Sequence, residues 1–301
     1  MKYLYYPGCS LKSTGRAYEE SLTAVFHALD IPFEELNDWN CCGATSYVSI
    51  DETQAFALAA RNLALAEAQK AFTNGHTVDL IAPCSACFLV LTKTQHYLQS
   101  YPDTNKKVVS ALAEVGLRYD GKVNVRHPID VLVNDIGIER IRKAVKKPLK
   151  GMHVASYYGC QIVRPFKTFD DPMYPTTMDT IVKALGGTPV DWSLKTRCCG
   201  GSLTGTIQGA GFRLNRALLK EAEKRHADVV LTCCPLCQHN LECYQERIND
   251  TYHEKIDIPI AYFTQLMGMA FGIDDKELAL QRLLIKPEYK PVADKKEAAH
   301  V

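Results

Sequence analysis

The chain has 301 residues, of which 35 are Lys or Arg and 34 are Asp or Glu, so its net charge is only +1. A dedicated nucleic-acid-binding protein normally carries a clear basic surplus, so this balance argues against one. Hydrophobic residues make up 47% of the chain, enough to bury a core in one large or two medium domains. No apolar run reaches the roughly 20 residues that span a bilayer, and the first residues lack the apolar stretch of a signal peptide.

Strands and helices are predicted to alternate along the chain. In the first half, short apolar runs and longer amphipathic stretches predict strand 2–6, helix 16–30, strand 31–36, helix 51–73 with Gly75 as its C-cap, strand 78–83 and helix 88–100. The second half follows the same order, with strand 153–158, helix 177–187, strand 188–192, helix 211–226 and strand 227–232. This alternation is typical of an α/β fold with parallel sheets and right-handed crossovers.

The cysteines form one pattern that occurs twice. Each half has a single Cys, then Cys-Cys-Gly, then Cys-x-x-Cys, and equivalent cysteines are 151, 157 and 150 residues apart (9 to 160, 42 to 199, 87 to 237). The first set is Cys9, Cys41, Cys42, Cys84 and Cys87, and the second set is Cys160, Cys198, Cys199, Cys234 and Cys237. A near-constant offset over five positions indicates an internal duplication.

The duplication predicts two pseudo-symmetric domains, each a short parallel sheet flanked by helices. We place them at 1–145 and 146–285, followed by a disordered tail at 286–301 with few apolar residues. Several of the cysteines follow strands directly, so they are expected at the carboxyl edge of each sheet, where α/β proteins build their sites. The basic stretch 139–151 is predicted to be a solvated linker or helix face, with a docking patch for an anionic partner as the alternative.

Ten cysteines in two matching sets are too ordered to be explained as buried apolar residues. With no export signal in the sequence, we expect a reducing, cytoplasmic compartment, where thiols serve as metal ligands or catalysts rather than in disulfides. Zinc is one candidate, but it takes four ligands in a tetrahedron and each set offers five thiols. An iron–sulfur cluster accepts adjacent thiolates on different irons, and Gly43 and Gly200 allow close approach of the backbone. Iron–sulfur is the favoured interpretation and zinc stays open.

Five thiols also exceed the four that a cubane cluster needs, so either one Cys per set is a spectator or the cluster is not a simple cubane. The sequence has neither the usual ferredoxin cysteine run nor a glycine-rich dinucleotide or phosphate motif. Because no flavin or nicotinamide site is visible, electrons are expected to arrive from another protein.

At these residues the chain resembles the cysteine-rich CCG-domain proteins, and among them the B subunit of heterodisulfide reductase (HdrB). The flanking segments YYPGCS, YYGCQIVRP, RHPIDVLVNDIG and CCPLC carry the resemblance, which covers nearly the whole chain. The gap between CCG and Cys-x-x-Cys is longer in the first half, which we interpret as an insertion near 73–77. Cys233 and Cys243 fall outside the signature and are expected to pack in the protein rather than bind metal.

The resemblance implies that each set of five cysteines holds a non-cubane [4Fe–4S] cluster and that the two clusters face each other across a cleft. A disulfide substrate would bind between them and be split, with Cys9, Cys42, Cys160 and Cys199 at the reacting centre. Two one-electron donors that are also Lewis acids suit a substrate with two near-equivalent sulfurs. Implied partners are the ferredoxin-like and the flavin-containing subunits of the same complex, and a small thiol or disulfide substrate or a sulfur-carrier protein.

Five further side chains are weaker candidates. His127 follows a short strand and is considered as a proton donor for a leaving thiolate, against a structural role. Arg164, Lys12 and Arg16 are considered as partners of an anionic substrate tail, against ordinary ion pairs. Trp39, just before the first CCG, is expected to be a packing lid rather than an electron relay.

Three functions are compatible with these patterns. The leading one is the subunit that reduces a disulfide, or oxidises thiols, in a heterodisulfide-reductase-like complex. The second is an electron-transfer subunit of a succinate or fumarate reductase, or of a lactate or glycolate oxidase, that passes electrons to quinone. The third is a zinc-stabilised scaffold.

Overall fold

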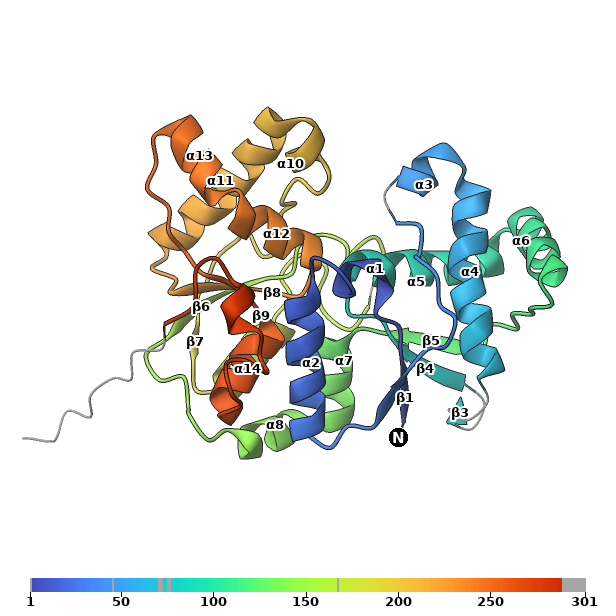
Figure 1. Ribbon diagram of the computed structural model, residues 1–301, viewed down its shortest axis with the longest axis horizontal. Helices are drawn as coiled ribbons and strands as arrows, with labels where there is room; N and C mark the ends of the chain where they lie inside the picture. Colours follow the sequence, from blue (N-terminus) through green and yellow to red (C-terminus); the bar gives the residue numbers. More distant parts are fainter. Residues whose placement is uncertain (1, 45, 70–72, 75–76, 167, 289–301) are drawn as a thin grey trace, which may run out of the picture.

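The computed structural model describes residues 2–44, 46–69, 73–74, 77–166 and 168–288 (Figure 1). The predicted C-cap Gly75 and residues 289–301 of the predicted tail lie outside this part of the chain. Among the described residues, no helix combines the length and apolar character needed to cross a membrane.

The first half builds a sheet of five strands surrounded by helices. Its elements are β1 (Tyr3–Tyr5), α1 (Gly8–Leu11), α2 (Arg16–Ala28), β2 (Phe33–Glu35), α3 (Ser46–Ile50), α4 (Glu52–Ala68), β3 (Thr73–Asn74), β4 (Thr77–Ile81), α5 (Ser85–Ser100), α6 (Pro102–Glu114), β5 (Val123–Arg126), α7 (Pro128–Asp130), the π-helix η2 (Val131–Ile136) and α8 (Ile138–Ala144). Strands β2, β1, β4 and β5 lie side by side and are all parallel, whereas β3 is antiparallel to β4.

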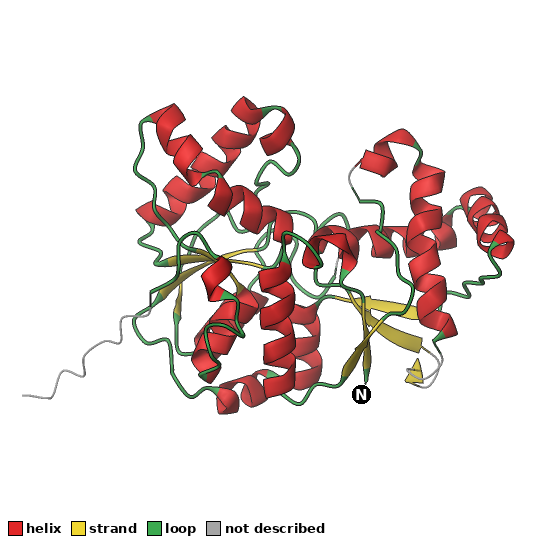
Figure 2. Ribbon diagram, in the orientation of Figure 1, coloured by secondary structure: helices red, strands yellow, loops and turns green. Residues whose placement is uncertain are grey.

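The second half builds a sheet of four parallel strands in the order β7-β6-β8-β9. Its elements are β6 (His153–Tyr157), α9 (Thr177–Ala184), β7 (Thr188–Pro189), α10 (Leu203–Thr206), α11 (Gln208–Lys224), β8 (Val229–Thr232), α12 (Pro235–Cys243), α13 (Gln245–Tyr252), β9 (Ile260–Tyr262), α14 (Phe263–Phe271) and the 3₁₀ helix η3 (Leu280–Arg282). Figure 2 shows the two sheets as separate layers, each flanked by helices. The predicted α/β fold with two duplicated parallel sheets is confirmed.

The parallel strands of the two sheets correspond one to one. Strands β2, β1, β4 and β5 of the first sheet have the same order as β7, β6, β8 and β9 of the second. Long crossover connections that contain helices join them, as parallel pairing requires. The duplication in the sequence is therefore a duplication of the sheet itself.

Two predicted elements differ clearly from the observed ones. The helix predicted at 51–73 ends at Ala68, and the antiparallel strand β3 follows, within the segment that we interpret as an insertion. The strand predicted at 188–192 is reduced to two residues, although the backbone of Val190 still donates to the carbonyl of Val154 at 2.8 Å. The basic stretch at the boundary agrees with the predicted helix face: it is helical over α8, where Arg142 pairs with Glu139 and Arg140 donates to the Leu29 carbonyl.

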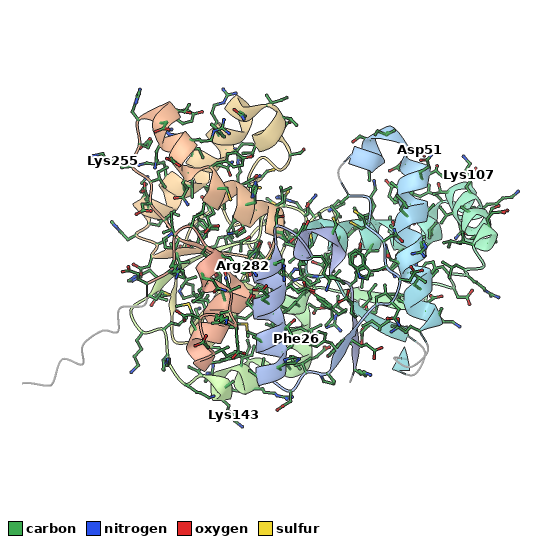
Figure 3. All side chains as sticks on the ribbon, in the orientation of Figure 1. Phe26, Asp51, Lys107, Lys143, Lys255 and Arg282 are labelled. Atoms are coloured by element: carbon green, nitrogen blue, oxygen red, sulfur yellow. The ribbon has the colours of Figure 1, made fainter. Side chains whose placement is uncertain are left out.

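Besides a core that lies within the second half, the molecule has one hydrophobic core that both halves build. This core contains residues of β1 and α2 together with residues of β9 and α14. Helix α2 lies against α14, and the ring of Tyr18 stacks on that of Tyr262 with centroids 4.6 Å apart. Arg282, labelled in Figure 3, pairs with Glu20 of α2 at 2.9 Å. The predicted limits of the domains, at 145 and 285, stay predictions.

Candidate functional site

Both sets of cysteines are assembled where parallel strands end. In the first half, β1 leads to Cys9 in α1, and β4 leads to Cys84 at the N-cap of α5. In the second half, β6 leads to Cys160, and β8 leads to Cys234 at the N-cap of α12. The N-terminal ends of α5 and α12 favour negative charge.

Within each set the sulfurs lie in contact. Cys9 and Cys41 are 3.6 Å apart, and Cys42 and Cys87 are 3.3 Å apart. The pair equivalent to Cys42 and Cys87 in the second set, Cys199 and Cys237, repeats this contact at 3.6 Å. In both sets the first cysteine of the CCG triplet is exposed and the second is buried. In each set, one cysteine of the CCG triplet thus lies at the surface and the other lies in the protein interior.

The two sets meet at the junction between the halves. The thiol of Cys84 is hydrogen-bonded with that of Cys234, which links the first set to the second. Beside them, the buried Ser85 hydroxyl lies 3.4 Å from the carbonyl oxygen of Cys233. The ten cysteines are therefore brought together at one place in the molecule.

A cavity of about 410 Å³ opens on the second set. Its wall includes all five cysteines of that set, and the first half contributes Ser49 and Ser85. The volume is more than ten times that of one water molecule, about 30 Å³. A group of several atoms can therefore occupy it in contact with all five sulfurs.

Two glycines let the backbone pass close to buried sulfurs. Gly8 has φ +67°, and a Cβ atom there would lie 3.0 Å from the sulfur of Cys87. Gly159 has φ +69°, and its Cβ atom would lie 3.0 Å from the sulfur of Cys237. Both positions therefore require glycine, for conformation and for space.

Two tyrosines hold the CCG loops, and we did not identify them from the sequence. Tyr6 donates a hydrogen bond to the carbonyl of Asn40 at 2.8 Å, just before Cys41. Tyr157 donates to the carbonyl of Arg197 at 2.7 Å, just before Cys198. Each follows or ends the first strand of its half, and the tyrosine pairs before Gly-Cys in YYPGC and YYGC were the signal that could have revealed them.

Contacts between sulfurs lower the pKa of several thiols. The hydrogen bond with Cys41 holds the pKa of Cys42 well below its usual value, and the hydrogen bond with Cys160 lowers the pKa of Cys198 to about 6. The hydrogen bond with Cys234 likewise lowers the pKa of Cys84. The same hydrogen bonds raise the pKa of the partner thiols Cys41, Cys160 and Cys234, so one thiol of each pair keeps its proton until a metal binds and releases it.

The arrangement suits a multi-metal cluster better than a single ion. Within the described ranges, no three or more His, Cys, Asp or Glu side chains converge on a point where one metal ion would sit. Zinc requires four ligands about 2.3 Å from one point, whereas a cluster spreads its metals over several ångströms. Sulfurs in pairs around a cavity fit the second case.

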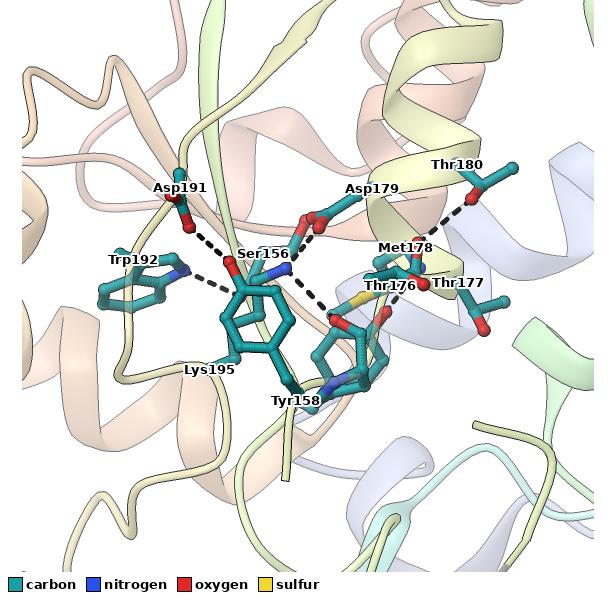
Figure 4. Close-up of polar contacts among 12 residues, drawn as sticks. Ser156, Tyr158, Thr176, Thr177, Met178, Asp179, Thr180, Asp191, Trp192 and Lys195 are labelled. Atoms are coloured by element: carbon teal, nitrogen blue, oxygen red, sulfur yellow. Dashed lines mark hydrogen bonds and ion pairs between the residues drawn. The ribbon is translucent and has the colours of Figure 1, made fainter. Parts of the chain in front are cut away.

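A buried ion pair holds the loop that precedes the second CCG triplet. Lys195 donates to Asp179 and to the carbonyl of Pro175, and its ammonium lies 4.3 Å from the ring centroid of Tyr174 (Figure 4). The carbonyl of Lys195 accepts from the backbone of Tyr158 at 2.9 Å. The pair thereby ties α9 to the loops that carry Cys160 and Cys198, and we did not identify it from the sequence.

His127 is placed away from solvent. It is completely buried, with Nε2 2.9 Å from the carbonyl of Pro83 and Nδ1 accepting from the backbone of Ile129. Burial lowers its pKa to about 4, so the ring is neutral. Nε2 contacts the backbone just before Cys84 and Nδ1 caps the start of α7, which favours the structural role. The role of proton donor stays a prediction that this geometry does not support.

Of the three basic candidates, Lys12 and Arg16 form ion pairs with carboxylates, whereas Arg164 bonds to a backbone carbonyl. Lys12 is 2.7 Å from both Glu19 and Glu35, and Arg16 is 3.7 Å from Glu20. These are the ordinary ion pairs given above as the alternative. Arg164 instead donates to the carbonyl of Thr196 at 2.5 Å, two residues before Cys198.

Trp39 and the two cysteines outside the signature have structural surroundings. Trp39 packs edge-on against Tyr6, with centroids 5.7 Å apart, in agreement with a packing role. Cys233 is buried with its sulfur 3.9 Å from the Tyr158 carbonyl. Cys243 is exposed, so the expectation that it packs in the core was wrong; it lies at the last residue of α12, where the helix face turns outward.

Comparison with known proteins gives relatives along the whole chain. The chain is 32% identical over 286 residues to the 8-methylmenaquinol:fumarate reductase membrane anchor subunit of Wolinella succinogenes, covering 94% of this chain and 97% of the relative. It is 30% identical over 286 residues to a protein of Archaeoglobus profundus named as similar to the B subunit of heterodisulfide reductase, covering 93% of each. It is 27% identical over 297 residues to the B subunit of a CoB-CoM heterodisulfide reductase of Methanosarcina acetivorans, covering 95% and 94%. The relatives are thus named as subunits of oxidoreductases.

A solved structure supports the fold alone. The crystal structure of a hypothetical protein from Helicobacter pylori matches with a TM-score of 0.73 at 15% identity, over 96% of this chain and 53% of that one. This chain spans about half the length of that protein.

The family model described as the cysteine-rich domain CCG matches residues 3–92 and 154–242. The two matches lie one in each half, and each contains one complete set of five cysteines. The resemblance stated above is confirmed: the chain belongs to the cysteine-rich CCG-domain family and carries two copies of the domain.

Proposed function

We propose that this chain is the component of a heterodisulfide-reductase-like complex in which a disulfide is cleaved, or formed in reverse, at two [4Fe–4S] clusters of the non-cubane type. The observation that carries the proposal is the meeting of the two five-cysteine sets at Cys84 and Cys234. A substrate with two sulfurs can address both sets only where they are close together. Relatives named for the B subunit of heterodisulfide reductase support it.

The residues present fit such clusters. The two cysteine sets would hold one cluster each, with the exposed members Cys9 and Cys198 toward solvent and Cys42 and Cys199 toward the protein interior. Bound clusters would supply one-electron transfer and Lewis acidity. The chain itself positions the CCG loops that carry the thiolates, through Tyr6 and Tyr157.

The proposed function also implies electron-donating partner subunits, a compartment and a substrate. Electrons would come from a flavin-containing subunit through a ferredoxin-like one, in the cytoplasm, where thiols stay reduced. The substrate would be a small disulfide or the disulfide of a sulfur-carrier protein.

The test begins with iron, zinc and acid-labile sulfide on the anaerobically purified chain. About eight irons and eight sulfides per chain are expected for two four-iron clusters. Cys42→Ala and Cys199→Ala are each expected to remove one of two EPR signals and to leave the other. About two zincs without sulfide would overturn the proposal in favour of a scaffold.

A second function has one specific observation in its favour. The relative from Wolinella succinogenes is a fumarate reductase subunit named for 8-methylmenaquinol, which suggests electron transfer to or from quinone for this chain instead. Adding a dithiol to the oxidised clusters separates the two. A change in the EPR spectrum supports disulfide chemistry, whereas a response only to a reduced quinone analogue supports the second function.

A further inference from the structure

The two cysteine sets are copies, but their surroundings are not. Where the first half has Ser13, four residues after Cys9, the second half has Arg164, four after Cys160. Where the first half has Asn40 before its CCG triplet, the second has Arg197. The duplication therefore supplies a matched comparison of two otherwise similar sites within one molecule.

A third difference lies in the helices that follow each Cys-x-x-Cys. Asn240 is three residues after Cys237 on α12, and its amide nitrogen is 3.4 Å from the sulfur of Cys199 and 2.9 Å from the carbonyl of Gly201. The carbonyl contact requires a nitrogen, so it orients the amide and directs the second N–H to the sulfur. Asn240 is buried, so water does not compete for this bond. In the first half the equivalent residue of α5 is Val90, which donates nothing.

Like the hydrogen bond from Asn240, the charged side chains nearby favour negative charge at the second set more than at the first. In the first half, Lys12 is neutralised by Glu19 and Glu35, each at 2.7 Å, and Arg61 is neutralised by Asp38 at 2.5 Å. These cations therefore add little net positive field at the first set.

In the second half the cations are left uncompensated. In the described part of the chain, neither Arg164 nor Arg197 forms an ion pair with a carboxylate, and Arg164 is held beside Cys198 by its bond to Thr196. Arg197 is exposed, so solvent and salt weaken its effect. The buried Asn240 and the half-buried Arg164 dominate the difference.

Adding an electron makes a metal site one unit more negative. Hydrogen bonds to the ligand sulfurs and nearby positive charge both stabilise that extra charge, and so raise the reduction potential. All three substitutions between the halves act in favour of the second set. No bond is made or broken and no proton is needed in this step, because a one-electron donor supplies the electron and the site keeps it.

We propose that the second set, Cys160, Cys198, Cys199, Cys234 and Cys237, forms the more easily reduced of the two sites, so that an electron entering at the first set moves to the second. This inference rests on the proposed function, since it concerns the clusters that the sets would hold. The short route between them passes the contact of Cys84 with Cys234.

The test is a potentiometric titration of the full chain with dithionite, followed by EPR, after iron and sulfide have been quantified. Cys42→Ala assigns the remaining signal to the second set. The midpoint potential of the second set is expected to be the higher one. Asn240→Val should lower it without moving the first midpoint, and the reciprocal Val90→Asn should raise the first midpoint only. Arg164→Ser and Ser13→Arg form a second reciprocal pair, which applies if Asn240→Val loses its cluster.

Equal midpoints, a higher midpoint at the first set, or an unchanged second midpoint in Asn240→Val and Arg164→Ser with full iron content would overturn the inference. Absence of iron and sulfide from the wild-type chain would instead overturn the proposed function. The metal analysis and the titration thus separate the two failures.

Discussion

Glu242 is a carboxyl group buried outside the thiol site. It is 4% exposed, Gln238 donates to one of its oxygens, and the backbone of Leu284 donates to the other at 2.9 Å. Burial raises its pKa from 4.5 to about 7. The folded chain therefore keeps the proton over a range of pH in which the unfolded chain has lost it, and the unfolding free energy falls as pH rises from 4.5 to 7.

Glu242→Gln should remove this pH-dependent loss. The difference in unfolding free energy between the variant and the wild type is expected to shift in favour of the variant by up to about 3 kcal/mol as the pH rises from 4.5 to 8. Below pH 4.5 this difference should not change with pH. Urea denaturation at the two pH values measures it. The exposed Glu246 is the matched control, and Glu246→Gln is expected to change stability by less than about 0.5 kcal/mol at either pH. A gain that is the same at both pH values would contradict the explanation by burial.

The two glycines beside buried sulfurs give a second prediction. Gly8→Ala should lose the iron of the first set and Gly159→Ala that of the second, because each new Cβ atom would lie 3.0 Å from a ligand sulfur that cannot move away. Gly116→Ala is the control: its φ is +70°, so it carries a similar strain of about 1 kcal/mol, but nothing lies within 4 Å of the new atom. Iron and sulfide analysis of the three variants decides. Full iron in Gly8→Ala would show that contact with the sulfur does not matter.

At the scale of single residues, the sequence predicted which cysteines form the two sets, but it did not reveal the side chains that contact them. A repeated pattern of one rare residue type is visible without a structure. Tyr6 and Asn240 act through a backbone carbonyl and a sulfur that folding brings to them from distant parts of the chain. Asn240 also has no counterpart in the first half, so the repeat could not draw attention to it.

Among the elements, the link between α9 and the loop before the second CCG triplet depends on Lys195. Lys195→Met should lower the unfolding free energy by about 3–5 kcal/mol, because it leaves the carboxylate of Asp179 buried without its partner. The double variant Lys195→Met with Asp179→Leu should recover most of this loss. Urea denaturation of the single and double variants measures the coupling.

The pair of Lys220 and Glu254, 3.1 Å apart and partly open to solvent, is the control for the buried one. Lys220→Met is expected to lower stability far less than Lys195→Met, since an ion pair that water reaches contributes little. A loss of stability in Lys195→Met no larger than that in Lys220→Met, or a double variant as unstable as the single one, would show that the buried pair does not hold the loop.

Helices and strands whose apolar residues form a recognisable pattern were predicted from the sequence, whereas elements without such a pattern were missed. The strands β1, β4, β6 and β8 are short apolar runs, and α2 and α11 have one apolar face, so both kinds were recognisable. Helix α14 is buried on nearly all sides, and its sequence FTQLMGMAF therefore has no polar face to define a helical period. The π-helix η2 has no sequence signal that separates it from α7, which it continues.

For the whole molecule, the repeat predicted two domains but not how they pack. The contact of α2 with α14 is made by residues that the duplication does not pair with each other, such as Ser21 and Thr264, whose hydroxyl oxygens are 2.6 Å apart. The stacked rings of Tyr18 and Tyr262 lie beside them. A repeat shows which residues are equivalent, whereas contacts between the copies depend on three-dimensional placement. The second half also has a core of its own, which contains Trp192, but because these contacts belong to the core that both halves build, we expect the halves not to unfold independently.

The two tryptophans allow this to be tested, since the chain has one in each half. Trp39 donates to Glu35 at 2.9 Å in the first half, and Trp192 donates to the carbonyl of Ser156 at 3.0 Å in the second. In Trp192→Phe the fluorescence reports the first half alone, and in Trp39→Phe it reports the second. For each variant, we expect fluorescence and circular dichroism to give the same urea midpoint in the metal-free chain under reducing conditions, because loss of the shared core exposes both halves at once. If fluorescence and circular dichroism instead gave separate midpoints within one variant, each half would have a core sufficient for its own stability, and the contact of α2 with α14 would be a docking interface between two independent domains.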